Sequence, residues 1–392
     1  YSMKMIDEIK SLSNLLFEDI IAIRRHLHMY PELSFKEEKT SRYIKSILKK
    51  WNIDFTEGYV NTGILVVLEG CNPKSKCVAL RADFDALPIT EENEISYRSK
   101  NTGVMHACGH DAHTASMLGA LKILDDTKAS WSGTVKFIFQ PAEERLPGGA
   151  KQMIAEGVLE NPSVDNIIAQ HVLPELEVGK VGFRPGIYMA STDEIYIEIT
   201  GVGGHAALPQ NYNNPIISSS TLILQLNDLF LKKENLNSIF AIGFIEGNGS
   251  TNIIPNKVNL MGTFRALDED FRNKSHRKIQ AIVDRVAKDY NVQIDLEIRS
   301  GYPALFNDVQ FTEKQILNAS KYLGEDNVVK LPIRMTAEDF SYFANASPSC
   351  FYRLGSGNQL KGITHGLHTS KFNIDEEALR VGMGLIAYLA IS

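Results

Sequence analysis

The sequence is poor in cysteine, with only Cys71, Cys77, Cys108 and Cys350 among its 392 residues. So few cysteines exclude a disulfide framework as the basis of the fold. The sequence also lacks an apolar run long enough to cross a bilayer, and its first residues contain no apolar signal core. We therefore expect a cytoplasmic protein that is not anchored in a membrane.

The sequence has no block of charges of one sign. Lys and Arg number 41, Asp and Glu number 47, and the net charge is −6. This mixture favours neither nucleic acid nor an anionic membrane as a partner. The chain is 44% hydrophobic and 22% charged, which is typical of a globular protein, and its length suggests two domains.

Strand-like and helix-like segments alternate over the first 170 residues. This alternation predicts an α/β fold with a mainly parallel sheet. Apolar spacing predicts helices over 5–27, 34–48, 112–124 and 149–155, and strands over 63–68, 77–80, 135–139 and 166–169.

The pattern changes near residue 191 to the order β-α-β-β-α-β, which is that of a ferredoxin-like α+β domain. We therefore predict a discontinuous main domain, 1–189 plus 303–392, and an inserted domain, 190–302. The expected strands of the insert are 194–200, 238–245, 257–265 and 292–298, and its helices are 215–231 and 270–288.

Polar motifs follow three of the expected strands of the main domain. They are Arg81-Ala82-Asp83-Phe84-Asp85, Gln140-Pro141-Ala142-Glu143-Glu144 and Gln170-His171. In open α/β sheets, ligands bind beyond the carboxyl ends of the strands, so the three motifs are expected to converge on one site.

Cys108 and His110 begin the expected apolar helix. The field at a helix amino terminus lowers the pKa of a thiol, which favours Cys108 as a thiolate ligand of a metal, or as a bridge between two ions. The alternative is a nucleophilic cysteine. His106 and His113 are either hydrogen-bond partners of the ligands or solvent-facing caps.

Glu143 and Glu144 are adjacent carboxylates outside a helix, so their side chains point in different directions. One can bind a metal while the other accepts a proton from water. The alternative is a solvated acidic loop, which is less attractive directly after an apolar strand.

Several motifs resemble the metal-dependent amidohydrolases related to aminoacylase. The closest branch contains hippurate hydrolase, the plant auxin-conjugate hydrolases and N-acetyl-diaminopimelate deacetylase. The resemblance extends from residues 25–33 to 366–369. It rests chiefly on the motifs at residues 81–88, 106–111, 139–144 and 203–206.

The resemblance implies a site for two divalent metal ions, zinc or manganese, although nickel and cobalt also suit such ligands. Glu143 would be the general base and then the general acid, and Asp85 would orient a ligand. The implied ligands are Cys108, His110, Glu144, His171 and His368.

The sequence departs from the wider clan of zinc carboxypeptidases and aminoacylases at two positions. Asp83-x-Asp85 stands where that clan has His-x-Asp, and Cys108 stands in place of a bridging Asp. These departures leave the role of Asp83 and the identity of the metal open.

The resemblance also assigns residues of the inserted domain. His205, often supplied by the partner subunit, would stabilise the oxyanion, and Asn252 and Arg265 would hold the substrate carboxylate. A surface charge is the alternative for Arg265. The family further implies a homodimer formed through the inserted domain.

We therefore expect metal-dependent hydrolysis of the amide bond of small N-acyl amino acids. A dipeptidase or carboxypeptidase of the same clan is one alternative. A non-catalytic module that binds a metal or a ligand is another, but the sequence retains the base and every implied ligand.

Overall fold

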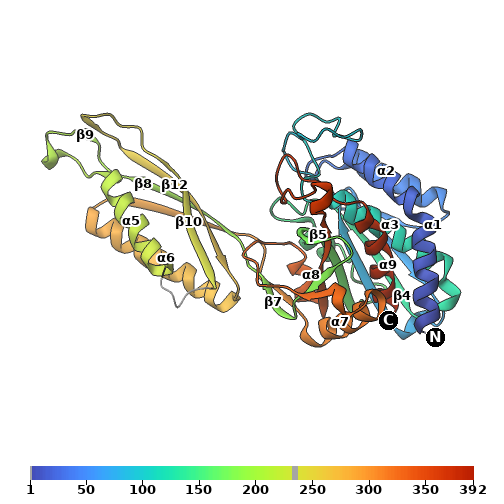
Figure 1. Ribbon diagram of the computed structural model, residues 1–392. Coiled ribbons are helices and arrows are strands. Elements are labelled where there is room, and N and C mark those ends of the chain that lie inside the picture. The colour runs from blue at the N-terminus through green and yellow to red at the C-terminus, as the bar shows by residue number, and fades with distance from the viewer. Residues whose placement is uncertain (1, 232–236) are drawn as a thin grey trace. The chain divides into compact units, whose positions relative to one another are not determined.

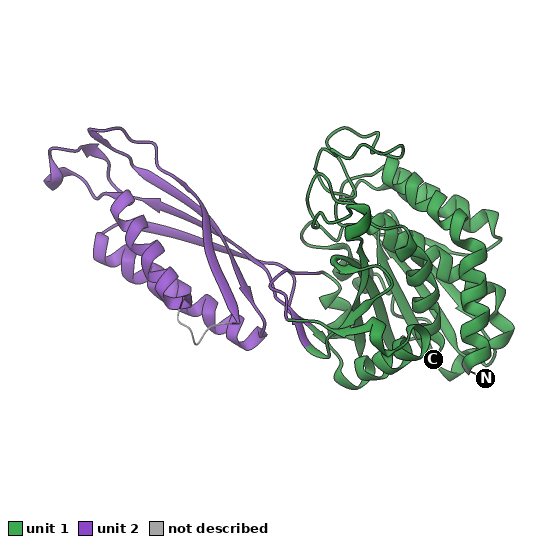
Figure 2. Cartoon of the chain, viewed as in Figure 1, with its two compact units in different colours: residues 1–186, 306–332, 339–392 green, residues 187–305, 333–338 purple. Residues whose placement is uncertain are grey.

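The computed structural model describes residues 2–231 and 237–392, which fold into two compact units (Figures 1 and 2). Unit 1 comprises residues 1–186, 306–332 and 339–392, and unit 2 comprises residues 187–305 and 333–338. Among the described residues, every helix is too short or too polar to cross a membrane.

Unit 2 contains a segment, 333–338, that the sequence had assigned to the main domain. The backbone explains the difference, because the Ala190 N–H donates to the carbonyls of Arg334 and Thr336, both at 3.2 Å. Hydrogen bonds across 144 residues or more leave no trace in local sequence patterns.

The sheet of unit 1 has eight strands in the order β1-β2-β4-β3-β5-β16-β6-β15. Its central pairs, β4–β3, β3–β5 and β5–β16, are parallel, whereas β1–β2, β2–β4 and β16–β6 are antiparallel. The expected mainly parallel α/β sheet is therefore confirmed. The strands are β1 (Thr56–Tyr59), β2 (Gly63–Glu69), β3 (Cys77–Asp83), β4 (Thr134–Gln140), β5 (Asn166–Glu177), β6 (Val181–Phe183), β15 (Val328–Lys330) and β16 (Ser349–Gly357).

Helices α1, α3 and α9 pack against one another and share the main hydrophobic core with the sheet (Figure 1). Helix α3 is buried on nearly all sides, which fits its apolar sequence. The helices of unit 1 are α1 (Ser2–Met29), α2 (Glu38–Lys50), α3 (His110–Asp126), α4 (Gly149–Ala155), α7 (Val309–Leu323), α8 (Ser341–Ala346) and α9 (Glu377–Ile391).

The predicted start of the second helix at residue 34 is wrong, because α2 begins at Glu38. Phe35 has a φ of 65°, a left-handed value that interrupts a helix, and residues 34–35 form a turn instead, with Glu37 as the N-cap of α2. The side chains of Ser34 and Glu37 are thereby free to contact other loops.

Unit 2 has a four-stranded antiparallel sheet in the order β10-β12-β8-β13, with α5 and α6 packed on its apolar face. This is the expected ferredoxin-like arrangement. Its elements are β8 (Asp193–Thr200), α5 (Pro215–Phe230), β10 (Ser238–Glu246), β12 (Lys257–Ala266), α6 (Glu269–Tyr290) and β13 (Gln293–Ser300). Two short pairs complete the fold, β9 (Gly204–His205) with β11 (Ile253–Ile254), and β7 (Gly186–Met189) with β14 (Leu305–Asn307).

Candidate functional site

Three neighbouring strands bring the polar motifs of unit 1 together. Asp83 ends β3 and Asp85 follows it, Glu143 and Glu144 follow the parallel strand β4, and His171 lies in the parallel strand β5. Strand β5 runs to Glu177, so His171 lies within it rather than after it. The motifs converge as the topology of the sheet predicts.

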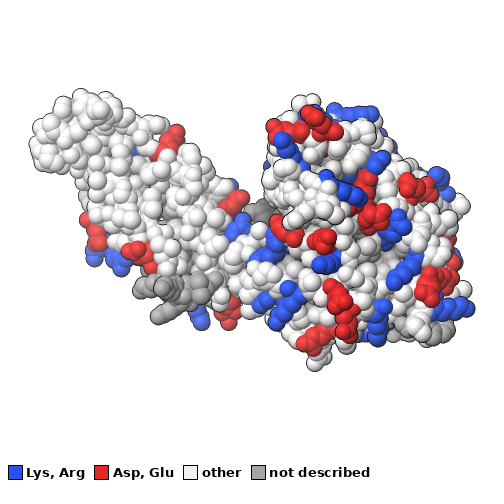
Figure 3. Space-filling view, viewed as in Figure 1, with Lys and Arg blue, Asp and Glu red and all other residues white. Residues whose placement is uncertain are grey.

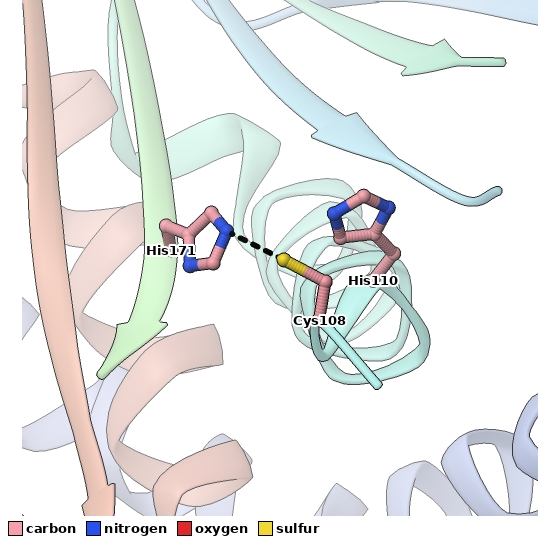
Figure 4. Close-up of side chains that lie close together, drawn as sticks. All are labelled: Cys108, His110 and His171. Carbon is pink, nitrogen blue, oxygen red and sulfur yellow. Dashed lines mark hydrogen bonds between the residues drawn. The ribbon is translucent and has the colours of Figure 1, made fainter. Parts of the chain in front are cut away.

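Cys108 and His171 are in direct contact. Cys108 Sγ lies 3.4 Å from His171 Nε2, and Figure 4 shows the thiol directed at the imidazole ring. His171 Nδ1 lies 2.8 Å from the Val172 carbonyl, to which it donates. The lone pair of His171 is therefore on Nε2, on the side of Cys108. The ligand atoms of Cys108, His110 and His171 all lie within 4.8 Å of one another.

A second group of donors shares Cys108 with the first. The ligand atoms of Cys108, Glu144 and His368 also lie within 4.8 Å of one another. His368 Nε2 is 3.2 Å from Glu144 Oε1, and His110 Nε2 is 3.7 Å from the same oxygen. Two overlapping groups that share one sulfur are a suitable arrangement for two ions.

The buried donors fit a divalent metal. Within residues 2–231 and 237–392, His110 Nε2 and Glu144 Oε1 are buried and make no hydrogen bond, although both belong to the ion-pair contacts given above. Buried polar atoms without a hydrogen bond are costly unless something else binds them. A set of thiol, imidazole and carboxylate ligands suits zinc and similar transition metals.

The electrostatics of the cluster also favour a cation. Burial alone would lower the pKa of His110, but Asp83 and Asp85 outweigh it and raise that pKa to about 10. The pKa of Cys108 is raised by burial and by Glu144 and Glu143, so the expectation of a thiol pKa lowered by the helix is wrong for the protein alone. The nearby carboxylates favour the protonated forms of His110 and Cys108. The same negative charges would favour a metal ion bound in place of those protons.

Hydrogen bonds orient the imidazole of His110. Its Nδ1–H donates to Asp85 Oδ1 at 3.0 Å, which turns Nε2 toward Glu144. Asp85 Oδ2 accepts from the Glu144 N–H at 2.9 Å and from the Ser34 hydroxyl at 2.7 Å. Asp85 thus contacts two of the expected ligand residues.

Asp83 belongs to a buried network beside the metal ligands. It accepts from His113 Nδ1 at 2.6 Å and from Arg81 Nη1 at 2.8 Å. Arg81 also donates to Asp339 at 2.7 Å, and Asp339 accepts in turn from the Gln140 side chain. Sequence reasoning considered His113 as a hydrogen-bond partner of the ligands, and the structure pairs it with Asp83 beside them. Sequence reasoning gave no role to Arg81, Gln140 or Asp339.

His106 and His113 are both buried, so the interpretation of either as a solvent-facing cap is wrong. His113 Nε2 accepts from the Val172 N–H at 2.9 Å, which ties α3 to β5. His106 makes no hydrogen bond to the described residues, and burial lowers its pKa to about 4.

The Glu143–Glu144 loop begins with an unusual backbone conformation. Ala142 has a φ of 55°, in the left-handed region that alanine rarely adopts. Glu143 follows directly and is buried, and its Oε1 accepts from the Asp339 N–H at 3.3 Å. The interpretation of this pair as a fully solvated loop is therefore wrong for Glu143.

His205 and Asn252 lie together in unit 2. The exposed His205 pairs with Ile253 in the β9–β11 ladder, and the Ala206 N–H donates to the Asn252 carbonyl at 3.1 Å. Arg265 lies near the other end of β12, eight residues beyond Lys257, which corresponds to roughly 26 Å of extended strand. Arg265 is half-buried and donates to the Met335 carbonyl at 3.4 Å.

Comparison with known proteins shows the family. The model of peptidase family M20/M25/M40 matches residues 79–392. The N-acetyl-L-cysteine deacetylase of Bacillus subtilis is 36% identical, covering 93% of this chain and 85% of its own length. Thermostable carboxypeptidase 1 of Saccharolobus solfataricus is 34% identical over 99% of both chains.

A solved structure supports the same assignment. The YXEP protein of Bacillus subtilis, described as a dinuclear metal-binding peptidase of the M20 family, is 31% identical to this chain. The TM-score is 0.82, with 96% of this chain and 98% of that one covered. This chain therefore belongs to peptidase family M20/M25/M40 and is a hydrolase of that family.

Proposed function

We propose that the protein uses two divalent metal ions to hydrolyse the amide bond of small N-acyl amino acids. The observation that carries the proposal is the pair of donor groups that share Cys108, beside the buried carboxylate of Glu143. Similarity to a deacetylase of an N-acyl amino acid supports this substrate class. Zinc or manganese is the proposed metal, and nickel and cobalt also suit the donors.

The metal site would use the five residues expected from the sequence. When bound, the ions would polarise the acyl carbonyl and lower the pKa of a water molecule. Asp85 would hold the ring of His110 through the hydrogen bond at its Nδ1. The proposed ligands are Cys108, His110, Glu144, His171 and His368.

Glu143 would move the protons of the reaction. Its carboxylate would accept a proton from the attacking water and then deliver it to the nitrogen of the leaving amine. The Asp339 N–H, bonded to Glu143 Oε1, would hold the carboxylate in place. In this scheme Glu143 does not bind a metal. The same side chain first accepts the proton as a base and then donates it as an acid.

Residues of unit 2 would bind the substrate. His205 would donate a hydrogen bond to the oxyanion, while Asn252 and Arg265 would hold the carboxylate of the amino acid. His205 and Asn252 lie at one end of unit 2 and Arg265 at the other. If all three serve one active site, they come from two subunits.

We therefore propose a homodimer formed through unit 2. Among the described residues, strand β10 lies at the edge of the four-stranded sheet, and α5 exposes the apolar side chains of Ile217 and Leu224. The visible face of unit 2 carries few charged side chains (Figure 3). An edge strand beside exposed apolar residues suits pairing with a second copy.

A carboxypeptidase or dipeptidase is the second candidate, favoured by similarity to a thermostable carboxypeptidase. The two functions differ in whether the acyl part of the substrate carries a free amine. The deciding experiment measures amine release from N-acetyl, N-benzoyl and indole-acyl amino acids and from dipeptides, with zinc or manganese and after chelation. Turnover of dipeptides alone would favour the second candidate, and no turnover despite bound metal would favour a binding module.

Glu143→Gln tests the proposed base. The amide cannot accept the proton of water, so we expect kcat to fall by at least about 10³-fold. Metal content, measured by elemental analysis, should stay near that of the wild type because Glu143 is not a proposed ligand. Wild-type kcat in this variant would show that Glu143 is not the base.

A further inference from the structure

Glu37 is a wholly buried carboxyl group that the scheme above does not use. It directly precedes α2 as its N-cap residue and, among the described residues, belongs to none of the groups that could hold a metal ion. Its Oε1 accepts a hydrogen bond from the Ala142 N–H at 2.9 Å. The contact joins two residues 105 positions apart, and it reaches the residue directly before Glu143.

Ala142 needs such support because its backbone is strained. A left-handed φ costs alanine on the order of 1 kcal/mol, so neighbouring groups must hold it there. The Ala142 carbonyl accepts from the Gly149 N–H at 2.9 Å. A Cβ on Gly149 would lie 1.9 Å from the Pro141 carbonyl oxygen, so only glycine fits there. Glu37 and Gly149 thus bind the two polar groups of the same strained residue.

The segment before α2, residues 32–37, also supports Asp85. Ser34 donates to Asp85 Oδ2 at 2.7 Å, and the same oxygen accepts from the Glu144 N–H at 2.9 Å. The Glu32 carbonyl accepts from the Ala86 N–H at 2.8 Å. Residues 32–37 therefore form hydrogen bonds both to Asp85 and to the loop that contains Glu143 and Glu144.

The environment of Glu37 favours a neutral carboxylic acid. Burial and the negative charge of Asp85 raise its pKa to about 8. A neutral acid and an amide have the same shape, and each has a carbonyl oxygen that accepts a hydrogen bond. Glutamine should therefore replace Glu37 well, whereas aspartate keeps the acid but is one methylene too short.

We propose that Glu37 is a positioning residue for amide hydrolysis. Its carboxyl group fixes the left-handed turn at Ala142, and this turn directs Glu143 toward the attacking water and Glu144 toward the metal. The inference rests on the proposed function, since it takes Glu143 as the base. A small displacement of the base lowers the rate of the chemical step more than it weakens substrate binding.

The test compares Glu37→Ala, Glu37→Asp and Glu37→Gln, with the exposed neighbour Glu38→Ala as a matched control. We expect the alanine and aspartate variants to lose about 10²-fold in kcat with KM changed less than about threefold. Glu37→Gln and Glu38→Ala should stay within about threefold of wild-type kcat. Metal content and melting temperature are measured for each variant, and if Glu37→Ala does not fold, the aspartate and glutamine pair decides.

Three results would overturn the inference: wild-type kcat in Glu37→Asp, Glu37→Gln as inactive as Glu37→Asp, or a rise in KM at unchanged kcat. Glu143→Gln is assayed in parallel. If that variant is inactive while the Glu37 variants are normal, only the positioning role fails. If Glu143→Gln is fully active, the proposed base fails instead.

Discussion

Hydrogen bonds to one ring nitrogen decide what each histidine of the site can do. His110 and His171 use Nδ1 for Asp85 and for the Val172 carbonyl, which leaves Nε2 available to a metal. His113 uses both nitrogens, Nδ1 with Asp83 and Nε2 with the Val172 N–H. His113 is therefore suited to supporting the ligands rather than binding an ion.

The contact between Asp85 and His110 gives a prediction for metal affinity. Asp85→Ala removes the acceptor that fixes the ring, so we expect the affinity for zinc to fall about 10- to 100-fold. Competition with a chromogenic chelator measures it. Asp54→Asn, an exposed carboxylate in unit 1, is the control. Unchanged affinity in Asp85→Ala would mean that the ring is held by other contacts.

Buried charges hold secondary-structure elements together at two places. In unit 1, Arg24 of α1 donates to Asp111 of α3 at 2.9 Å, one residue after His110. In unit 2, Asp193 at the start of β8 accepts from Arg272 and His276 of α6, both at 2.6 Å. Breaking such a buried pair typically costs about 3–5 kcal/mol, because one charge is left without its partner.

The cluster in unit 2 predicts a dependence of stability on pH. Burial alone would raise the pKa of Asp193, but hydrogen bonds from His276 and Arg272 outweigh it and lower that pKa. The folded pKa therefore lies below the unfolded value of about 3.9. The stabilisation is complete above that value and is lost as the pH falls through the lowered pKa.

We expect Asp193→Asn to melt well below the wild type at pH 7 and to approach it as the pH falls below about 4. Melting temperatures from circular dichroism across this range measure the gap. Asp228→Asn, an exposed residue of α5, should show no such trend. A gap that is independent of pH would assign the effect to packing instead of charge.

At the scale of the whole molecule, the proposed homodimer follows from the residues at the two ends of unit 2. His205 and Asn252 cluster around β9 and β11, whereas Arg265 lies near the opposite end of β12. A rigid antiparallel sheet fixes this separation. A single copy would therefore offer these residues to two different places, which supports the proposal of an active site shared between two subunits.

Subunit complementation tests this proposal. Glu143→Gln and His205→Ala should each be inactive alone, but mixed dimers would contain one site with both wild-type residues. Random reassortment should restore about one quarter of the wild-type activity. Mixing without any recovery, after exchange of subunits has been verified, would contradict a shared site.

The interface itself is tested with Ile217→Lys plus Leu224→Lys. Two buried charges would disfavour association. The molar mass from sedimentation should therefore fall from twice 43.7 kDa, the mass of a dimer, to the mass of a single chain. Leu15→Lys, on a similarly exposed residue of α1, is the control and should remain dimeric. A wild-type monomer would remove the dimer proposal.

Much of the fold and part of the site followed from the sequence. Apolar periodicity located about half of the described strands and most of the described helices, because side-chain spacing reports local backbone geometry. The motifs placed Cys108, His110, Glu144 and His171 at neighbouring strands and helix ends. His368 came only from the resemblance, since an isolated histidine carries no local signal. Cytoplasmic location stays a prediction.

Only the tertiary structure decided which side chains support the site. Glu37 contacts Ala142 across 105 residues, and Arg81 contacts Asp339 across 258. Because a helix was expected from residue 34, the contact of Glu37 with a distant loop was not foreseen. The structure also shows that His113 is buried, although the sequence allowed it a position facing solvent. A periodic pattern describes the direction of a side chain within its own element. Its hydrogen-bond partner depends on where distant segments pack, which the folded chain alone determines.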